Sequence, residues 1–516
     1  MKKLICGILI VLLLLFSACA REEVNEFQRL LGEANTLHAA QAEMVPEENI
    51  RNYVTALPAT ELGFTEEELV SLTEGIGRSF NGDRKLSLSQ AKQDVDLLFR
   101  VFRYCYGVYE YFGGDEVFGE AKDAVLNDLD ALGNMLKARD MAAVLKKHLA
   151  FIQDGHFYIN SSAVLEPLSY FSTEEFVFSE DSQGYFSQVD GEKQYLLSIG
   201  GDAEIESYMK PSIGPGGELI YYLGMLGEKT VRNQIVDAAF DKTTVSLMLN
   251  NAAFTKAYDA APAYSEDWKG KVPVVVCRDL TMPETCKSFI SSAAKLSSYE
   301  IAILDLRGNS GGSPDAVKQW LNAYGPDGLW KYWLATSAMS RTGRALSYIL
   351  AHSMDAGANY FSLWDTNNRQ RDLYMQLYRT GENSYDISRE NVPLKQLNAK
   401  GLLFVLMDDR DFSAGEALLF ALRNRENTIF VGTNSGGALR GGTGQQVVLP
   451  NSKISFSYGS SLFFWYDERV FQEGRGFLPD IWVNGDSLER VQKLIAYYNL
   501  VESNEANDTE ADGNTD

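Results

Sequence analysis

The chain is 516 residues long, which is too long for one ordinary hydrophobic core, so two or three domains are expected. Hydrophobic residues make up 45% and charged residues 23%, a balance that excludes a globally disordered chain. With 47 basic and 70 acidic side chains the net charge is −23, which excludes the basic surface of a protein that wraps nucleic acid.

The first residues form a targeting segment rather than part of the fold. Lys2 and Lys3 precede the apolar run 4–16, and the Phe-Ser-Ala-Cys sequence ending at Cys19 resembles a bacterial lipoprotein signal. We expect removal of residues 1–18, lipid modification of Cys19 and a membrane-anchored protein that faces outside the cytoplasm. An ordinary signal peptide and an uncleaved anchor helix are the alternatives. No later apolar run is long enough to span a bilayer.

The next two stretches are expected to be mainly helical. Residues 19–86 are predicted to form a tether followed by short helices, because 20–45 are polar and the Thr-Glu-Glu-Glu sequence at 65–68 is typical of a capping box. Residues 87–160 are predicted to form a helical region, since apolar side chains recur at helical spacing in three segments. The third helix is expected to run into the Gln-Asp-Gly-His sequence ending at His156, where the glycine stops it.

The rest of the chain changes character twice. Residues 161–270 alternate short aromatic and β-branched runs with Gly and Pro, which predicts a mainly β module with one or two helices. Residues 271–499 alternate short apolar runs with helix starts, as buried parallel strands do in an α/β domain. The acidic tail 500–516 lacks apolar periodicity and is expected to be disordered. The apolar runs are Pro273 to Cys277, Ile301 to Leu306, Leu402 to Met407 and Thr428 to Gly432.

One strand, turn and helix start place a serine hydroxyl at a helix N-terminus. The apolar run 402–407 leads through 408–412 into Ser413-Ala414-Gly415-Glu416. Free N–H groups and the helix dipole at such a position stabilise negative charge. The pattern has the geometric logic of a nucleophile elbow without a full G-x-S-x-G. Taken alone, the segment favours a plain N-cap role for Ser413.

A glycine-rich loop, Asp305-Leu306-Arg307-Gly308-Asn309-Ser310-Gly311-Gly312, follows another apolar run. Glycines let the backbone approach a ligand closely, and consecutive N–H groups can bind an anion. The loop lacks the Gly-Lys-Ser/Thr of a phosphate loop and the G-x-G-x-x-G of a dinucleotide site, so a nucleotide is a poor fit. A plain strand-to-helix turn is equally consistent with the loop by itself.

A serine nucleophile needs a base, and the chain has four histidines. His38 lies in the expected tether, His148 in the apolar stripe of its helix as a core residue, and His352 in a long connection. His156 follows a helix stop in a polar turn and is the candidate base, although a lone histidine is usually structural. The scattered histidines and the absence of an H-E-x-x-H or C-x-x-C sequence predict neither a metal nor a cofactor.

Four blocks stand in a fixed order along the second half of the chain. They are Asp305 to Gly312, Ser413 to Glu416, Gly432 through Gly437, and Gly476 to Ile481. These blocks resemble those of the C-terminal processing (tail-specific) serine peptidase family, which includes the tricorn core. The resemblance extends over about 87–160 and 271–485. It implies a ClpP/crotonase-like α/β core that cleaves peptide bonds in a peptide or an unfolded protein.

The resemblance also implies roles for individual residues. Ser413 would be the nucleophile, and the backbone N–H groups of Ala414 and of Gly311 or Gly312 would form the oxyanion hole. Family members often carry a PDZ domain where residues 161–270 stand. That stretch lacks a clear carboxylate-binding loop, so recognition of a substrate C-terminus is not inferred.

The base departs from the bacterial members of the family. Those enzymes pair the serine with a lysine in a Gly-Lys-Gly turn, and here Ala438 stands at the matching place. The resemblance therefore implies His156 as the base, as in tricorn-like and nisin-resistance-like members. Glu473 stands where tricorn-type enzymes have a glutamate, so it is a candidate to orient His156; a solvated loop carboxylate is the alternative. Gly155 replaces the serine that precedes the tricorn histidine.

The sequence thus predicts a lipid-anchored extracytoplasmic serine peptidase that works through an acyl-enzyme. Its predicted partners are a peptide substrate and the membrane, and not nucleic acid. The alternative is a catalytically inactive lipoprotein on the same fold that binds a peptide or an apolar ligand, which an aromatic content of 12% would also suit.

Overall fold

The computed structural model describes most of the chain. The described residues are 25–39, 47–254, 262–326, 328–332, 337–355, 367–389, 397–464 and 470–501. The predicted signal segment, the predicted lipid site at Cys19 and the tail from 502 onward lie outside them. Within the described ranges, no helix is both long enough and apolar enough to cross a lipid bilayer.

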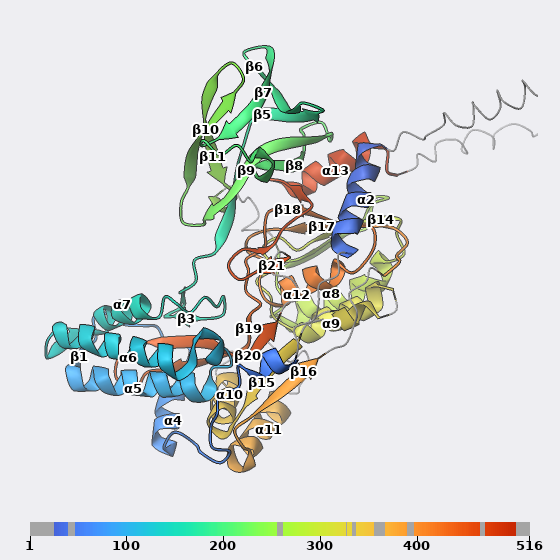
Figure 1. Cartoon of the computed structure of the whole chain (residues 1–516). Coiled ribbons are helices and arrows are strands. Elements are labelled where there is room, and N and C mark those ends of the chain that lie inside the picture. Colours follow the sequence, from blue (N-terminus) through green and yellow to red (C-terminus); the bar gives the residue numbers. More distant parts are fainter. Residues whose placement is uncertain are drawn as a thin grey trace, which may run out of the picture.

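The N-terminal helical region packs around an aromatic-rich core at one end of the molecule (Figure 1). Its elements are α3 (Glu47–Arg51), α4 (Glu66–Thr73), β1 (Lys85–Ser87), α5 (Leu88–Cys105), α6 (Gly114–Ala131), β2 (Met135–Lys137) and α7 (Ala138–His148). The predicted capping box is present, since Thr65 and Glu68 exchange hydrogen bonds. α7 ends at His148, earlier than predicted, and the chain then reaches His156 without helix. Leu149 and Ile152 are nevertheless fully buried, so apolar packing continues beyond the last helical turn.

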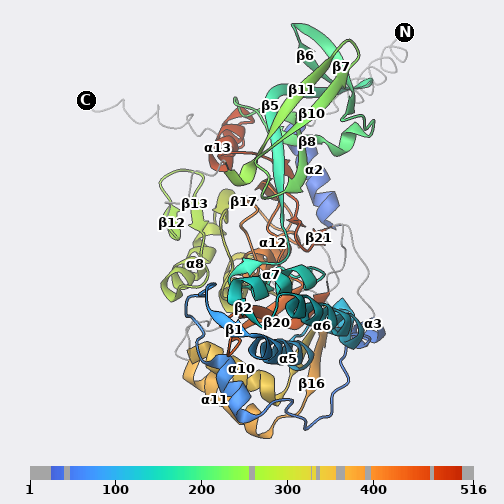
Figure 2. The same ribbon diagram turned by 90° about the vertical axis from the view of Figure 1, so that its left-hand side faces the viewer.

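The middle of the chain forms a separate β module at the opposite end of the molecule (Figures 1 and 2). Its strands are β5 (Leu168–Asp181), β6 (Gly184–Val189), β7 (Glu192–Ile199), β8 (Met209–Ile213), β9 (Leu219–Glu228), β10 (Asn233–Phe240) and β11 (Thr244–Asn251). They pair in the order β11-β10-β7-β6-β5-β9-β8, and β11 also pairs with β5, which closes part of the sheet on itself. The one or two helices expected in this stretch are present in its described part only as two short 3₁₀ helices, at Ile205–Ser207 and Ala252–Phe254.

The α/β core is built on a mainly parallel sheet, as predicted. Its strands are β12 (Tyr264–Asp267), β13 (Val274–Cys277), β14 (Ile301–Asp305), β17 (Leu402–Met407), β18 (Thr428–Gly432) and β23 (Ile481–Trp482), in that order. All neighbours after β13 pair in parallel, whereas β12 is an antiparallel edge. The strands read as continuous apolar runs because helices cover both faces of the sheet.

The two faces of the core sheet are covered by different helices. One face packs against α8 (Pro283–Leu296), α9 (Pro314–Tyr324) and α12 (Ala414–Leu422). The other packs against α13 (Ser487–Tyr497) and α2 (Glu26–Ala39). α2 lies in the stretch predicted to be a tether, so that prediction is wrong for residues 26–39. Phe27 and Ala34 form an apolar stripe that is buried against the sheet, and the His38 ring bonds to Asp480 at 2.9 Å.

A second sheet joins the helical region to the core. Its strands are β3 (Tyr158–Ile159), β4 (Ser162–Ala163), β15 (Ser337–Thr342), β16 (Ser384–Arg389), β19 (Gly441–Val448) and β20 (Ser455–Phe464), with α10 (Arg344–Asp355) and α11 (Asn367–Thr380) packed nearby. Phe456 of β20 pairs with Ile159 of β3, nearly 300 positions earlier. Because β3 starts two residues after His156, this pairing brings the histidine turn to the core.

Candidate active site

Ser413 lies on the turn between β17 and α12 and is held in a strained conformation. Its φ of 53° and ψ of −117° are rare for a residue with a side chain. Its backbone N–H donates to Glu416 Oε2 at 3.3 Å, within the first turn of α12. The serine hydroxyl therefore stands at the N-terminal end of a buried helix, where developing negative charge is stabilised.

The turn before Ser413 is bound to the glycine-rich loop by short hydrogen bonds. The Gly308 N–H donates to Asp408 Oδ1 at 3.1 Å, and the Asn309 N–H donates to Asp411 Oδ1 at 3.0 Å. In return the Phe412 N–H donates to the Asn309 carbonyl at 2.9 Å. These two aspartates show no periodic signal in the sequence, and sequence reasoning missed them as the residues that fix the nucleophile turn.

The glycine-rich loop approaches the nucleophile more closely than any side chain would allow. A Cβ added to Gly311, whose φ is +86°, would lie 2.9 Å from Ser413 Cβ and 3.1 Å from the Ala414 nitrogen. The Gly311 N–H donates to Asn309 Oδ1 at 2.9 Å. Gly311 and Gly312 are the two loop residues predicted as oxyanion donors. Gly311 already uses its N–H in this bond, whereas Gly312 does not.

The structure brings His156 to Ser413, as the sequence predicted. His156 Nε2 lies 3.1 Å from Ser413 Oγ, although 257 positions separate the two residues. The approach depends on Gly155, since a Cβ there would lie 2.5 Å from the Ala438 Cβ. The histidine turn thus packs directly on the residue that stands where related bacterial enzymes have their lysine. Burial lowers the pKa of His156, while the charge of Asp154 opposes that shift, so the ring is neutral at neutral pH and able to accept a proton.

Glu473 lies beside the histidine turn but binds its backbone. Its Oε1 accepts from the Gly155 N–H at 2.7 Å, and its Oε2 accepts from the N–H groups of Arg440 at 2.9 Å and Leu439 at 3.2 Å. Burial, reinforced by the charge of Asp154, raises the pKa of Glu473. The structure thus differs from the solvated loop carboxylate considered for this position, because both oxygens of Glu473 accept hydrogen bonds from backbone N–H groups.

Asp154 is a second buried carboxylate at the site, and sequence reasoning assigned it no role. It is 0% exposed; its Oδ1 accepts from the His156 N–H at 2.8 Å and lies 3.9 Å from His156 Nδ1. Its Oδ2 accepts from the Tyr106 hydroxyl at 2.8 Å. The Asp-Gly-His sequence was the available signal for Asp154, whereas nothing in the sequence connects Tyr106, at the end of α5, with this turn.

The cluster of Asp154, His156 and Glu473 is the one group of potential metal ligands in the described ranges. One ligand atom from each lies within 4.8 Å of the others. Both carboxylates already accept backbone or tyrosine hydrogen bonds, as described above, so the two acidic members of the cluster have protein donors. The two carboxylates lie beside the histidine turn, which is an arrangement suited to orienting His156 as a base.

Glu416 connects the nucleophile with the loop beside the histidine, and sequence reasoning also missed this role. It is 0% exposed, and it accepts from the Ser435 hydroxyl at 2.6 Å and from the N–H groups of Gly437 and Ala438 at 2.8 Å each. Burial raises its pKa to about 7, against the lowering effect of these donors. One buried carboxyl therefore holds Ser413 and the Gly437–Ala438 turn in a fixed relation.

The base of the β module also contacts the nucleophile turn. Asp409 is fully buried; its Oδ2 accepts from the Ser169 hydroxyl at 2.8 Å, and its carbonyl accepts from Lys229 Nζ at 2.8 Å. Ser169 lies at the start of β5, and Lys229 directly follows β9. The module is thus attached through the same turn that precedes Ser413.

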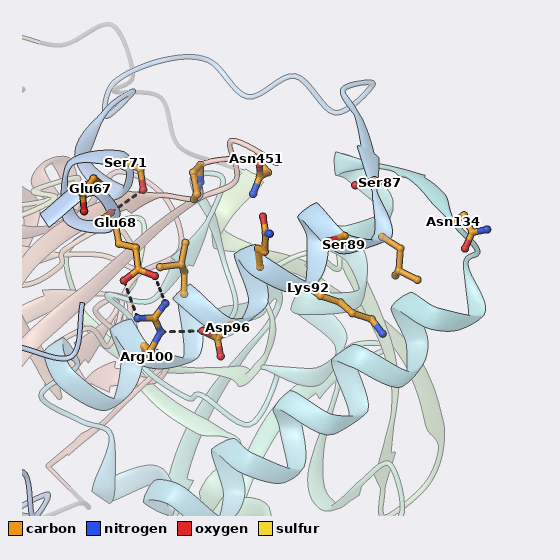
Figure 3. Close-up of a pocket in the computed structure, with 14 residues that line it drawn as sticks. Glu67, Glu68, Ser71, Ser87, Ser89, Lys92, Asp96, Arg100, Asn134 and Asn451 are labelled. Atoms are coloured by element: carbon orange, nitrogen blue, oxygen red, sulfur yellow. Dashed lines mark hydrogen bonds and ion pairs between the residues drawn. The ribbon is translucent and has the colours of Figure 1, made fainter. Parts of the chain in front are cut away.

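The other histidines lie elsewhere. His148 was expected in the core, but it is only partly buried and pairs with Asp128 at 2.8 Å. The His352 ring stacks on Tyr348 within α10. A hollow of about 1090 Å³ between α4, α5 and the turn at 450–451 contains none of the site residues, and within it Arg100 pairs with Glu68 and Asp96 (Figure 3).

A strained serine at a helix N-terminus, a neutral histidine at hydrogen-bond distance and an adjacent glycine loop define a hydrolytic site of the serine type. Residues 275–483 match the model of peptidase family S41. This range includes the strands β14, β17, β18 and β23 and all of β13 except its first residue. These residues are therefore similar to the tail-specific proteases of that family, and the chain is a serine-type peptidase. The predicted α/β fold class, with its helical N-terminal region and mainly β middle module, is confirmed.

Several solved structures share similarity with the chain at low sequence identity. Mature CPAF in complex with lactacystin is 15% identical, with 80% of this chain and 97% of that chain covered and a TM-score of 0.36. The photosystem II D1 C-terminal processing protease is 12% identical, with 78% and 96% covered and a TM-score of 0.34. A putative peptidase from Parabacteroides merdae is 13% identical, with 81% and 100% covered and a TM-score of 0.35. No curated protein matches the chain.

Proposed function

We propose that this protein is a membrane-anchored extracytoplasmic serine peptidase that hydrolyses peptide bonds through an acyl-enzyme, with Ser413 as nucleophile and His156 as base. The observation that supports it most is the distance of 3.1 Å between His156 Nε2 and Ser413 Oγ, at a strained turn that opens a helix. A neutral imidazole at this distance suits general-base catalysis near neutral pH.

In the proposed reaction, His156 Nε2 takes the hydroxyl proton while Ser413 Oγ bonds to the carbonyl carbon of the substrate. The tetrahedral intermediate collapses when the carbon–nitrogen bond breaks, and the imidazolium gives its proton to the leaving amine. Water then attacks the acyl-enzyme with His156 as base again, which releases the acid and restores Ser413.

The developing oxyanion is proposed to bind the N–H groups of Ala414 and Gly312. Ala414 is the first residue of α12, so its N–H belongs to the free donors of a helix N-terminus. Gly312 is favoured over Gly311 because the Gly311 N–H already donates to Asn309 Oδ1. A substrate carbonyl placed between two such donors would gain stabilisation mainly in the transition state.

Membrane attachment through a lipid on Cys19 is the proposed location. The supporting observations are the signal-like sequence ending at Cys19 and the packing of α2 on the core sheet. Seven Cα–Cα steps separate Cys19 from Glu26, and an extended chain of that length reaches at most about 25 Å. A lipid-anchored chain would therefore hold its peptidase core close to the membrane surface, and substrates near the membrane would be favoured.

The catalytic proposal is tested by labelling the folded protein with a fluorophosphonate probe and locating the adduct by mass spectrometry. We expect the adduct on Ser413, and we expect Ser413→Ala and His156→Ala to lose on the order of 10³-fold or more in kcat on a peptide library. His148→Ala is the matched control, because His148 also pairs with an aspartate but lies outside the site.

Two outcomes would contradict the catalytic proposal. Full turnover of His156→Ala would remove the histidine from its role as base. A folded wild-type protein that neither reacts with the probe nor cleaves any peptide would favour the ligand-binding lipoprotein instead.

The location is tested by cell fractionation. We expect Cys19→Ser to release the protein from the membrane fraction, while the control Cys6→Ser, within the predicted signal segment, leaves it attached. A Cys19→Ser protein that stays with the membrane and lacks any lipid mass would overturn the anchor.

A further inference from the structure

We propose that Asp154 is the carboxylate that positions His156 during catalysis and that Tyr106 in turn positions Asp154, while Glu473 holds the backbone around them. This inference rests on the proposed Ser413–His156 pair. It assigns to Asp154 the orienting role that sequence similarity gave to Glu473.

The first argument concerns the unused nitrogen of the base. His156 Nδ1 is buried and makes no hydrogen bond, while Nε2 faces Ser413. A buried N–H without a partner is costly, so a carboxylate is expected to accept from it when the ring becomes charged. Asp154 Oδ1 lies 3.9 Å from Nδ1, and closing this gap by about 1 Å gives an ordinary hydrogen bond. Catalytic hydrogen bonds are often this long before a substrate binds.

The second argument is that the two carboxylates have different partners. Each oxygen of Glu473 already accepts from backbone N–H groups, at Gly155 on one side and at Leu439 and Arg440 on the other. Glu473 therefore joins the histidine turn to the chain after Ala438. Asp154 instead accepts from the His156 N–H and from a tyrosine, and this leaves Oδ1 facing the imidazole edge.

The third argument is that the surroundings of Asp154 are buried and closely packed. Tyr106 is 0% exposed, and its ring packs against Phe157 and Tyr458. Its hydroxyl donates to Asp154 Oδ2 at 2.8 Å. On the other side a Cβ at Gly441 would lie 2.5 Å from the same oxygen, so only glycine fits there. The carboxylate is thus locked in one rotamer beside the imidazole.

This arrangement has a chemical consequence for the base. When His156 takes the serine proton, its positive charge forms beside a buried negative charge, which stabilises the imidazolium and holds the productive tautomer. Asp154 favours the protonated ring, so removing its charge lowers the pKa of His156 further. A role confined to folding would not change that pKa.

The test uses Asp154→Asn and Tyr106→Phe in the full-length protein, with peptide turnover and fluorophosphonate labelling measured from pH 5 to 9. We expect Asp154→Asn to lower kcat on the order of 10²- to 10⁴-fold with KM changed by less than about threefold, and its acidic limb to move to lower pH. Tyr106→Phe is expected to lower kcat about threefold to tenfold, and this loss should vanish in the Asp154→Asn background.

Matched controls are present in the same helical region. Asp94→Asn changes another fully buried aspartate that accepts backbone N–H groups. Tyr109→Phe removes the 2.8 Å bond that another buried tyrosine donates to an aspartate, here the exposed Asp115. We expect both controls to leave the pH profile unchanged. We also expect each to change kcat by the same factor in the wild-type and in the Asp154→Asn background.

Three results would overturn the proposal. The first is an Asp154→Asn variant with the kcat of the wild type and an unchanged acidic limb of its pH profile. The second is an acidic limb that shifts in Glu473→Gln but not in Asp154→Asn. The third applies if Asp154→Asn fails to fold, and it is an equal loss of kcat in Tyr106→Phe and Tyr109→Phe. A wild-type protein without labelling at Ser413 would instead refute the proposed function itself.

Discussion

The two sides of the active site are built in different ways. The nucleophile side consists of the β17–α12 turn and the glycine-rich loop after β14, two adjacent parallel strands of one sheet. The base side is an irregular segment between α7 and β3, which reaches the core through the β3–β20 pairing and through contacts of Gly155 with Glu473 and Ala438. The proposed nucleophile is therefore part of the core, whereas the proposed base is brought to it from another region.

Because of this difference, we expect changes on the two sides to affect stability and activity to different extents. A change on the nucleophile side disturbs the buried turn network and is expected to cost both folding free energy and activity. A change on the base side displaces one turn against the surface of the core, so activity is expected to fall more than stability. The following variants test this division, from the largest expected effect to the smallest.

Gly311→Ala is expected to have the largest effect, because it acts on the core. The new Cβ would lie 2.7 Å from the Phe412 carbonyl oxygen and 2.9 Å from Ser413 Cβ, at a φ of +86°. We expect a loss of about 2–4 kcal/mol in unfolding free energy, and labelling of Ser413 slowed by more than about 10²-fold. Gly184→Ala is the control, since its φ is +120° but nothing lies within 4 Å. Equal losses in the two variants would show that backbone strain alone is responsible.

Gly155→Ala is expected to affect activity more than stability. Its Cβ would lie 2.5 Å from Ala438 Cβ and 3.0 Å from the Gly437 carbonyl oxygen, so the histidine turn has to move away. A displacement of about 1 Å is expected to slow turnover by 10- to 10²-fold, with less than about 1.5 kcal/mol lost on unfolding. Gly119→Ala, in α6 with nothing within 4 Å, is the control. A stability loss as large as that of Gly311→Ala would contradict the proposed difference between the two sides.

Glu416 contacts both sides, and its raised pKa predicts that the stability of the protein depends on pH. Its pKa in the folded protein is about 7, above the ordinary value of 4.5, so the folded state binds its proton more tightly than the unfolded state. The resulting stabilisation is full below pH 4.5 and is lost as the pH rises through 7. Between pH 5 and 7 this amounts to about 2 kcal/mol. Thermal unfolding at several pH values measures it, and Glu416→Gln is expected to be less stable but to show a flatter slope. An unchanged slope would show that other groups titrate.

Much of the core was predictable because its signals are local. The apolar runs identified four strands, and the Ser-Ala-Gly-Glu and glycine-loop sequences identified the nucleophile side, since both lie directly at strand ends. The polar stretch before residue 45 was misjudged because α2 buries only a narrow apolar stripe, which is a weak signal in a helix of 14 residues. The Asp154–Tyr106 bond was not predictable, because its partners are 48 positions apart and neither shows a periodic pattern.

The sequence by itself determined the class of protein, the serine at its helix start and the histidine that we propose as its base, because each depends on residue type and short spacing. Only the tertiary structure decided which carboxylate faces the histidine. Asp154 and Glu473 are both acidic and both near the right motifs, and nothing local in the sequence distinguishes them. The distinction comes from the direction of their hydrogen bonds, which the docking of the helical region onto the core creates.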